Sequence, residues 1–364
     1  MSLKIAIACG GTGGHLFPGL AVSKELQNRG HETVLLVSPK QIDAIALKGS
    51  GEKSHSLPNM GFPGLFNPKV LKFAWTLWQS RQACKKIYRE FQPDAVLGMG
   101  GFTCAVPLML AGQMGKPTLI HDSNAYPGKV TRLLAPKMTK TLLGFEDCAQ
   151  HLPNANCVTV GTPVRQGLER IDRAAAAAQL AMDPAKFTVL VMGGSQGARG
   201  INDVIIKTLA ISHELADRVQ FLHLAGPTDA ETVAQQYAEQ PFQYRAEPFA
   251  SAMELYYSLA DLVVARSGAS SLNETAHYGL PSLLIPYPYA ADDHQALNAA
   301  IFEQAGAALV YAQHELDAET LKRDLVEFLG DETKRFNMSR AAQALAGTNA
   351  AAAVANEVEA CVQN

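Results

Sequence analysis

The sequence predicts an α/β protein built from two Rossmann-like, doubly wound parallel sheets. A short apolar run, a glycine turn and a helical stretch follow one another over residues 5–22, and the same order returns from residue 187. These stretches lie about half a chain apart in a chain of 364 residues, which is long enough for two domains. Short apolar runs separated by helical segments are typical of parallel strands covered on both faces.

The first half contains four expected strands and one clear helix. The helix is expected over Pro18–Arg29, because its apolar spacing stops at Gly30. A second glycine loop, Gly98–Gly101, follows the third of these strands. The strands are expected at Lys4–Cys9, at Thr33–Val37, within residues 93–106 and at Pro117–Ile120.

The second half starts close to Pro163, where the pattern restarts. An alanine-rich helix is expected at Arg173–Ala181, and the part from about Asp317 onward reads as helical. Strands are expected at Phe187–Met192, Gln220–Leu224, Asp261–Ala265 and Pro281–Pro286. After the third of these, Arg266–Glu274 gives another strand-to-helix turn, with hydroxyls that suit a helix cap.

The glycine turn before His15 predicts an anion site. Glycines allow the backbone to approach a ligand, and a helix N-terminus offers unpaired N–H groups with a partial positive charge. A dinucleotide fingerprint fails here, since Leu16 stands at its last glycine and no acid follows Val37. No Walker A pattern occurs. The sequence therefore disfavours nicotinamide enzymes and P-loop ATPases.

Composition narrows the class of protein further. The net charge of −3 gives no basic signature for nucleic acid. Six cysteines without a C-x-x-C pair indicate reduced thiols of a cytosolic protein. The N-terminus does not resemble a signal peptide, and no stretch is apolar for long enough to cross a bilayer. Any membrane contact is therefore expected to be peripheral.

The segment Gly61–Arg89 differs from the rest, because it combines both tryptophans with six cations and no acid. Such a mixture favours contact with an anionic membrane surface. The alternative is an amphipathic helix packed on the sheet, with a solvated basic face. A second acid-free basic run from Lys129 to Lys140 tilts the interpretation toward the membrane.

Seven motifs in one order carry a family resemblance. Over essentially the whole chain they resemble the MurG family, the peripheral membrane N-acetylglucosaminyltransferases of peptidoglycan synthesis. The motifs are Gly-Gly-Thr-Gly-Gly-His, Gly-Met-Gly-Gly, His-x-x-Asn, Pro-Val-Arg, Gly-Gly-Ser-Gln-Gly-Ala, Arg-Ser-Gly-Ala and Asp-His-Gln-x-x-Asn-Ala.

The resemblance implies a GT-B fold, with two Rossmann-like domains facing across a cleft. Residues 1–162 would take the acceptor lipid I and associate with the membrane, and residues 163–339 would bind the donor UDP-GlcNAc. A C-terminal helix of about 340–364 would pack back on the first domain. The enzyme would invert the sugar carbon, make lipid II and need no metal. It would work at the cytoplasmic face of the bacterial plasma membrane, with cell-wall synthesis proteins as possible partners.

The resemblance also assigns residues to the UDP-GlcNAc site. Diphosphate would meet the first loop together with Arg165 and Ser195, backbone groups at Ala250 would read the uracil, Glu274 would bind ribose hydroxyls, and Asn124 and Gln295 would contact the sugar. The full set is Thr12, Gly13, Gly14, Asn124, Arg165, Ser195, Ala250, Ala269, Ser270, Ser271, Leu272, Asn273, Glu274 and Gln295. Departures from the family pattern occur on the acceptor side, at Phe102, Asp122, Ser123 and Thr162.

His15 is the candidate general base, because a helix N-terminus favours the neutral imidazole that a base needs. The alternative is a polar residue of the first helical turn that only orients phosphate. Asp292-Asp293-His294 has poor spacing for a metal site and suits a helix cap better. Three other functions stay open: a MurG-like glycolipid synthase, a UDP-GlcNAc 2-epimerase and a non-enzymatic nucleotide-sugar-binding protein.

Overall fold

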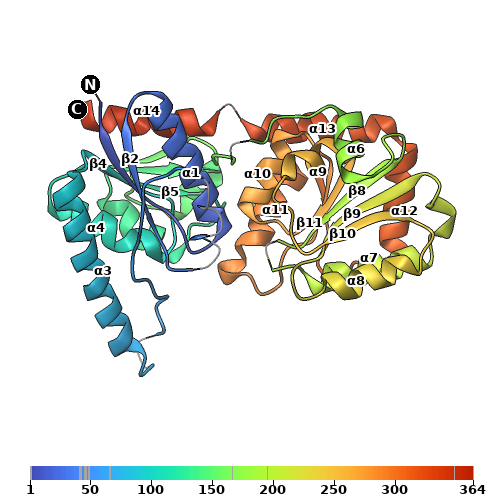
Figure 1. Cartoon of the computed structure of the whole chain (residues 1–364), viewed down its shortest axis with the longest axis horizontal. Coiled ribbons are helices and arrows are strands. Elements are labelled where there is room, and N and C mark those ends of the chain that lie inside the picture. The colour runs from blue at the N-terminus through green and yellow to red at the C-terminus, as the bar shows by residue number, and fades with distance from the viewer. Residues whose placement is uncertain are drawn as a thin grey trace. The chain divides into compact units, whose positions relative to one another are not determined.

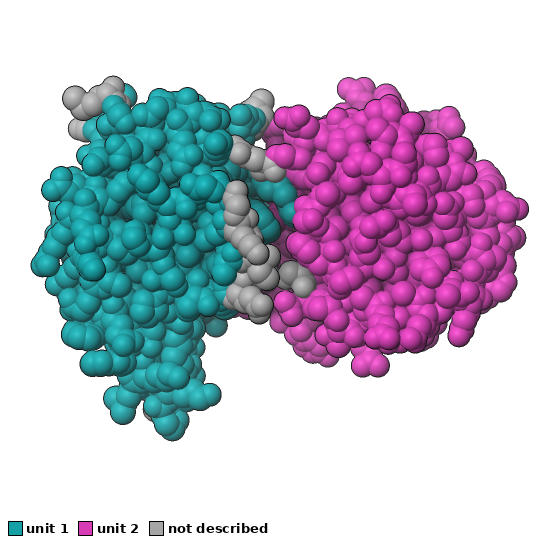
Figure 2. All heavy atoms as spheres, in the orientation of Figure 1, with its two compact units in different colours: residues 1–166, 348–364 teal, residues 167–347 magenta. Residues whose placement is uncertain are grey.

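The chain folds into two compact α/β units. The computed structural model describes residues 2–40, 43–44, 47, 50–64, 67–165, 167–194, 196–347 and 349–363. Unit 1 comprises residues 1–166 and 348–364, and unit 2 comprises residues 167–347 (Figures 1 and 2). The chain therefore leaves unit 1 once and returns to it at its C-terminal end.

The described part of unit 1 contains a seven-stranded sheet in which every pair of neighbours is parallel. The strand order is β3-β2-β1-β4-β5-β6-β7, so the order reverses between β1 and β4. The strands are β1 (Lys4–Ala8), β2 (Glu32–Val37), β3 (Ser54–Ser56), β4 (Ala95–Gly98), β5 (Thr118–Asp122), β6 (Lys140–Leu143) and β7 (Cys157–Thr159).

Helices cover both faces of this sheet, and each face buries an apolar layer. Side chains of β1 alternate between the two layers: Ile5 and Ile7 join one, whereas Ala6 and Ala8 join the other. This double burial explains why the strand is apolar at every position from Ile5 to Ala8. The helices are α1 (Gly13–Asn28), α3 (Val70–Phe91), α4 (Ala105–Gln113), α5 (Lys129–Leu134) and α14 (Ala350–Gln363).

Unit 2 repeats the plan with a parallel six-stranded sheet among its described residues, in the order β10-β9-β8-β11-β12-β13. The order again reverses beside the first strand of the unit, between β8 and β11. The strands are β8 (Phe187–Met192), β9 (Val219–Leu224), β10 (Gln243–Glu247), β11 (Leu262–Ala265), β12 (Ser282–Leu284) and β13 (Ala308–Val310). The helices are α6 (Arg173–Leu180), α7 (Arg199–Ala210), α8 (Ala230–Ala238), α9 (Met253–Leu259), α10 (Ala269–His277), α11 (His294–Gln304), α12 (Ala318–Gly330) and α13 (Glu332–Ala346).

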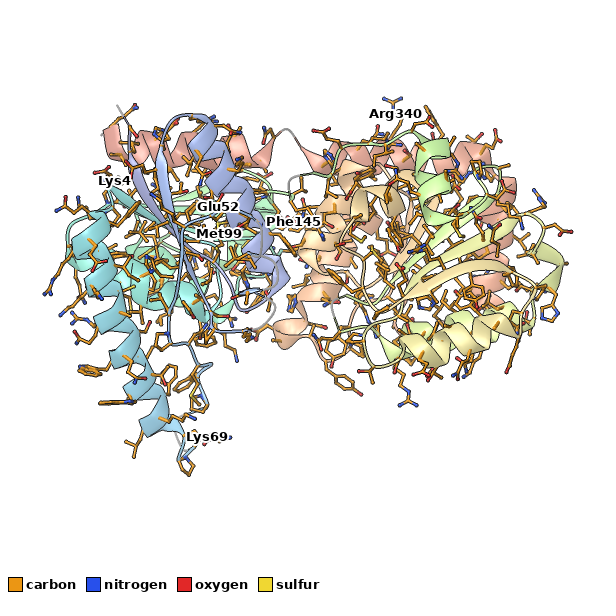
Figure 3. All side chains as sticks on the ribbon, in the orientation of Figure 1. Lys4, Glu52, Lys69, Met99, Phe145 and Arg340 are labelled. Atoms are coloured by element: carbon orange, nitrogen blue, oxygen red, sulfur yellow. The ribbon has the colours of Figure 1, made fainter. Side chains whose placement is uncertain are left out.

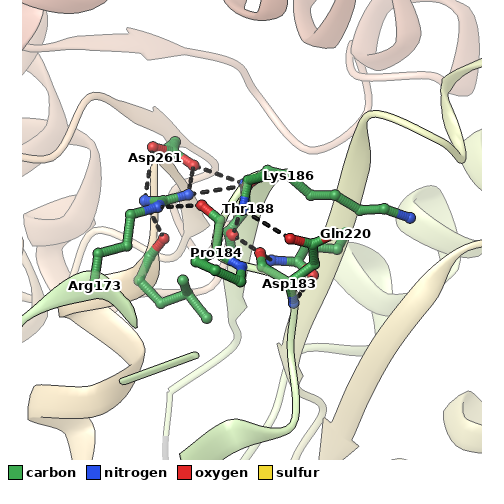
Figure 4. Close-up of polar contacts among 9 residues, drawn as sticks. Arg173, Asp183, Pro184, Lys186, Thr188, Gln220 and Asp261 are labelled. Atoms are coloured by element: carbon green, nitrogen blue, oxygen red, sulfur yellow. Dashed lines mark hydrogen bonds and ion pairs between the residues drawn. The ribbon is translucent and has the colours of Figure 1, made fainter. Parts of the chain in front are cut away.

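A polar brace closes the amino-terminal edge of the second sheet. The Arg173 guanidinium makes a two-pronged ion pair with Asp261, with N–O distances of 2.8 and 3.1 Å (Figure 4). The same guanidinium donates to the carbonyl oxygens of Pro184 and Lys186, and Asp261 also accepts the N–H of Thr188 at 2.8 Å. These contacts tie α6 to the starts of β8 and β11, at the edge opposite the glycine loops.

Two expected helix boundaries were wrong. The first helix begins at Gly13 rather than at Pro18, because the glycine turn itself forms the first helical turn, with Thr12 in extended conformation before it. The segment that returns to unit 1 begins at residue 348 rather than at 340. Residues 340–346 end α13 in unit 2, and Gly347, with φ of +64°, breaks the helix there.

Helix α14 is an integral part of unit 1. Val354 and Val358 are fully buried in the same apolar layer as Ile5 and Ile7. At the rim of this contact, the Arg29 guanidinium donates to Glu359 at 3.0 Å, and His31 contacts the same carboxylate at 2.8 Å. The C-terminal helix thus completes one face of the first sheet.

Helix α3 is packed over only half of its length. Its buried residues lie between Ser80 and Tyr88. Its first half extends beyond the body of unit 1, and Lys69 marks the tip (Figures 2 and 3). There Trp75 is 57% exposed and Trp78 is 51% exposed, and their rings stack at 4.8 Å. The alternative, an amphipathic helix packed on the sheet with a solvated basic face, fits the second half of α3 but not its exposed first half. Within the described residues, no helix has the length and apolarity needed to span a membrane.

Candidate functional site

In unit 1 the glycine loops meet where the strand order reverses. In doubly wound sheets, ligands bind outside the carboxyl ends of the strands at this place. The first loop follows β1 and leads to His15, and the second follows β4. A methyl group added to Gly100 would lie 3.1 Å from the His15 ring, and one added to Gly101 would lie 3.3 Å from it. Glycines in the second loop therefore make room for the imidazole.

Two features define the state of His15. Its Nδ1 lies 3.0 Å from Oγ1 of Thr12, the residue that precedes the helix. Burial lowers the pKa of His15 below its ordinary value, although the nearby Asp122 carboxylate acts in the opposite sense. The imidazole is therefore neutral at pH 7, which is the form that accepts a proton.

The Asp43 carboxylate binds the backbone of the first glycine loop, and no sequence motif predicted this role. Its carboxylate is fully buried. It accepts the N–H of Gly11 at 2.9 Å, and both the N–H and the hydroxyl of Ser38 at 3.0 and 2.6 Å. A methyl group added to Gly10 would lie 2.5 Å from one of its oxygens. The N–H of Gly11 is thus engaged by a carboxylate, although a phosphate contact was the expectation for this turn.

A cavity of about 330 Å³ opens beside this loop, entirely within unit 1. His15 and Thr12 form one part of its wall. Lys40 forms another, and its ammonium donates to the carbonyl oxygen of Gly11 at 2.7 Å. The lining residues are Gly10, Gly11, Thr12, His15, Ser38, Pro39, Lys40, Asn59, Met60, Gly61, Gly101, Phe102 and Thr103.

Asn124 and Arg165 belong to different segments of unit 1. Asp122 forms the loop that carries Asn124, because its carboxylate accepts the N–H of Asn124 at 3.1 Å and that of Gly128 at 2.8 Å. The Arg165 guanidinium lies over the ring of Phe17, 4.6 Å from its centre. Phe17 belongs to the first turns of α1, two residues after His15. The arginine is therefore positioned near the start of that helix.

In unit 2 the corresponding loops follow β8 and β11. The loop after β8 packs tightly: Gly197 has φ of +77°, and a methyl group there would lie 2.2 Å from a backbone oxygen. The expected phosphate ligand in this loop, Ser195, lies outside the described residues. The loop after β11 leads into α10, where Ala269 and the residues from Leu272 to Glu274 are buried, whereas Ser270 and Ser271 are half-buried.

Hydrogen bonds connect the start of α10 to Gln295. The Ser267 hydroxyl donates to the Gln295 carbonyl oxygen at 2.7 Å, and the Asn298 amide donates to the Ser267 carbonyl oxygen at 3.1 Å. The side-chain oxygen of Gln295 accepts the N–H of Tyr287 at 3.0 Å. An amide whose oxygen is held in this way offers its NH₂ group to a ligand.

Two more expected residues have distinct surroundings. Glu274 is 3% exposed, and its Oε2 accepts the hydroxyl of Tyr257 at 2.9 Å. Tyr257 is a second residue that the sequence patterns did not indicate. Ala250 is buried, whereas the preceding Phe249 is 54% exposed. The structure thus gathers Ala269–Glu274 and Gln295 around one end of the second sheet.

Among the residues described, no group of three or more His, Cys, Asp or Glu side chains is arranged to hold a metal ion.

Comparisons with known proteins cover both units. Residues 5–143 match the model of the glycosyltransferase family 28 N-terminal domain, and residues 188–357 match that of the C-terminal domain. A UDP-N-acetylglucosamine–N-acetylmuramyl-(pentapeptide) pyrophosphoryl-undecaprenol N-acetylglucosamine transferase of Geobacter sulfurreducens is 36% identical over 98% of both chains. A transferase with the same name from Acidithiobacillus ferrooxidans is 34% identical, over 100% of this chain and 98% of that protein.

Solved structures give the same picture of the fold. The crystal structure of Acinetobacter baumannii MurG matches with a TM-score of 0.76 and 25% identity, over 98% of this chain and 99% of that one. A putative UDP-N-acetylglucosamine 2-epimerase from Listeria monocytogenes matches with a TM-score of 0.70 at 13% identity, over 100% of this chain and 96% of that one. The latter likeness shows the fold alone.

Proposed function

Because the chain belongs to the family of UDP-N-acetylglucosamine–N-acetylmuramyl-(pentapeptide) pyrophosphoryl-undecaprenol N-acetylglucosamine transferases, we propose that it makes lipid II. It transfers GlcNAc from UDP-GlcNAc to the MurNAc C4 hydroxyl of lipid I, with inversion, to form a β-(1→4) linkage. The identity of 36% to a named transferase over 98% of the chain carries this conclusion. The fold is GT-B, with one Rossmann-like sheet in each unit.

This assignment replaces the alternatives that the sequence left open. The epimerase alternative has a structural likeness at 13% identity, which concerns the fold alone. Three relatives that are 34–36% identical over 96–98% of the chain carry the name of the lipid I transferase.

In the reaction, the C4 hydroxyl of MurNAc attacks the anomeric carbon of GlcNAc. A new C–O bond forms on one face of that carbon, and the bond to the UDP oxygen breaks on the other. We assign the hydroxyl proton to Nε2 of His15. Support comes from the lowered pKa of His15 and from its place in the cavity wall. The Thr12 hydroxyl, 3.0 Å from Nδ1, would accept the Nδ1 proton and leave Nε2 as the base.

UDP leaves with the bonding electron pair, so the site must stabilise growing negative charge. The N-terminus of α10 offers backbone N–H groups for this purpose. We propose that Gln295 donates its NH₂ group to sugar hydroxyls, because its side-chain oxygen is already occupied by Tyr287. Glu274 would accept ribose hydroxyls, and backbone groups at Ala250 would bind uracil. The donor roles of Thr12, Gly13, Gly14, Asn124, Arg165 and Ser195 stay predictions.

We assign the acceptor sugar to the cavity beside His15. Its wall continues through residues 59–61 toward the segment that leads into α3. The acceptor's lipid tail lies in a membrane, and a protruding helix with exposed tryptophans next to cations suits such a surface. We therefore propose that Gly61–Arg89 contacts the anionic membrane.

Vesicle sedimentation tests the membrane contact. Replacing Trp75 and Trp78 by alanine is expected to weaken binding to anionic vesicles more than tenfold, because each ring contributes about 1.5–3 kcal/mol when fully buried. Phe336→Ala is the matched control, since Phe336 is an aromatic residue on unit 2 that is 62% exposed. Equal losses in both variants would remove the special role of α3.

The activity itself is tested by UDP release from UDP-GlcNAc with a short-chain lipid I analogue and EDTA present. Release that depends on the acceptor, and its loss in His15→Ala, is the expected result. Release with a glycerolipid acceptor instead would overturn the acceptor assignment. Conversion of UDP-GlcNAc without any acceptor would point to an epimerase.

A further inference from the structure

We propose that Tyr257 is a positioning residue for the nucleotide, which sets the Glu274 carboxylate so that it recognises the ribose. The proposal rests on the proposed function of Glu274 and adds a residue and a selectivity to it. It predicts that Tyr257 contributes to the preference for a ribonucleotide donor over a 2′-deoxyribonucleotide donor.

The contact itself is short and buried. Tyr257 is 1% exposed and Glu274 is 3% exposed, and the hydroxyl lies 2.9 Å from Oε2. A carboxylate that is withdrawn from water needs hydrogen-bond donors, and a bond to an ionised acceptor is stronger than a neutral one. A hydrogen bond to one oxygen also fixes the rotation of the whole carboxylate group.

Tyr257 is itself held in place on several sides. Its ring packs against the ring of Tyr278, with 5.1 Å between the centroids. The Tyr278 hydroxyl donates to the Glu169 carbonyl oxygen at 3.1 Å, so the second ring is anchored as well. The Tyr257 hydroxyl also lies 3.8 Å from the sulfur of Met192, the last residue of β8. The hydroxyl is therefore a fixed point rather than a group that adapts to the carboxylate.

The location explains why a fixed carboxylate matters for the nucleotide. Helix α9 brings Tyr257 and helix α10 brings Glu274 to the carboxyl ends of β8 and β11, where the strand order reverses (Figure 1). Ligands of doubly wound sheets bind at this place. A ribose presents two neighbouring hydroxyl donors, which a carboxylate accepts only in a narrow range of orientations. A rotating carboxylate would lose this selectivity while keeping its charge.

The test compares UDP-GlcNAc with its 2′-deoxyuridine analogue by donor kcat/KM. The wild-type protein is expected to prefer the ribonucleotide by about 10- to 100-fold, which is the value of a hydrogen bond to a charged group. Tyr257→Phe should lower this preference about three- to tenfold, and Glu274→Ala should abolish it. The preference is a ratio within one variant, so a smaller fraction of folded protein does not change it. Binding of UDP and 2′-deoxy-UDP gives the same ratio without an acceptor.

Tyr311→Phe is the matched control, because Tyr311 donates to the Asp324 carboxylate at 2.7 Å elsewhere in unit 2. It should keep the wild-type preference. If Tyr257→Phe also keeps it while Glu274→Ala loses it, the positioning role is refuted and the ribose assignment stands. If Glu274→Ala keeps the preference, the ribose assignment fails and the positioning role fails with it.

Discussion

Replacing Asp43 by asparagine tests whether a buried carboxylate holds the glycine loop that leads to His15. The carboxylate accepts hydrogen bonds from three donors, the N–H of Gly11 and the N–H and hydroxyl of Ser38. Asparagine keeps the size of the side chain but offers one oxygen only. All three donors approach the same oxygen, Oδ2, and Oδ1 lies 3.2 Å from the Gly11 nitrogen, so an asparagine oxygen at the Oδ2 position turns the NH₂ group toward the Gly11 N–H.

The expected loss of stability follows from these contacts. The three bonds pass from a charged to a neutral acceptor, which weakens each of them by about 1 kcal/mol, and the new NH₂ group faces the Gly11 N–H. We expect a total loss of about 2–4 kcal/mol. For a unit of this size, each kcal/mol lowers the unfolding midpoint by about 2–4 °C.

The loss of activity should exceed what the loss of stability explains. Gly11 begins the turn that carries His15, and a shift of about 1 Å in a catalytic group lowers the rate by up to about 10²-fold. The assay is kcat for UDP release, at a temperature where calorimetry shows the variant to be folded. Asp94→Asn is the matched control, because Asp94 accepts the N–H of Lys4 at 2.8 Å at the other end of β1.

Two results would refute this reasoning. Asp43→Asn with wild-type stability would mean that the charge of the carboxylate contributes nothing to the three hydrogen bonds. An equal loss of kcat in Asp94→Asn would mean that any weakening of β1 lowers activity, without a special role for the loop.

Three further predictions concern pH, a glycine and the C-terminal helix. Because burial lowers the pKa of His15, kcat/KM should stay constant as the pH is lowered to 6.5, and should fall only below that pH, when the ring gains a proton. A pH-rate profile in which the fall begins above pH 6.5 would contradict this prediction. Gly197→Ala should lower the free energy of unfolding by more than about 2 kcal/mol, because it combines a left-handed φ with a backbone clash. Gly194→Ala has a left-handed φ but open space around the new methyl group, and should lower it by about 1 kcal/mol in the same thermal unfolding experiment. Equal losses in the two variants would refute the role of the clash. Arg29→Ala should lower stability by about 1 kcal/mol at low salt and less at high salt, because its partner Glu359 is partly exposed; a loss that does not depend on salt would point to packing instead.

The sequence predicted the central strands well and the edge strands poorly. For β8 the predicted and observed bounds agree, because all six residues from Phe187 to Met192 are buried and only Thr188 among them is polar. The edge strands β3, β7, β10 and β13 were missed, and so was β6, which lies next to an edge. Ser54–Ser56 is exposed throughout, and Gln243–Glu247 is half-buried, so neither has the apolar run that marks a covered strand.

In the candidate site, loops with a local sequence motif could be predicted, whereas residues that act through contacts with distant segments could not. The glycine loops after β1, β4, β8 and β11 could be recognised, because a turn that needs glycine leaves glycine in the sequence. Asp43 and Tyr257 could not. Each is a single residue without a motif, and its role depends on a contact with a segment that is 17 to 32 positions away in the chain.

The return of the chain to unit 1 has a consequence for biosynthesis. Unit 2 is one uninterrupted segment, residues 167–347, inserted into unit 1. During translation, the synthesis of unit 2 is therefore complete before the last residues of unit 1 are made. One apolar face of the first sheet is covered only after Val354 and Val358 have been synthesised. Until then this face is exposed, and it can misfold or bind chaperones. We therefore expect the segment that is made first to complete its folding last.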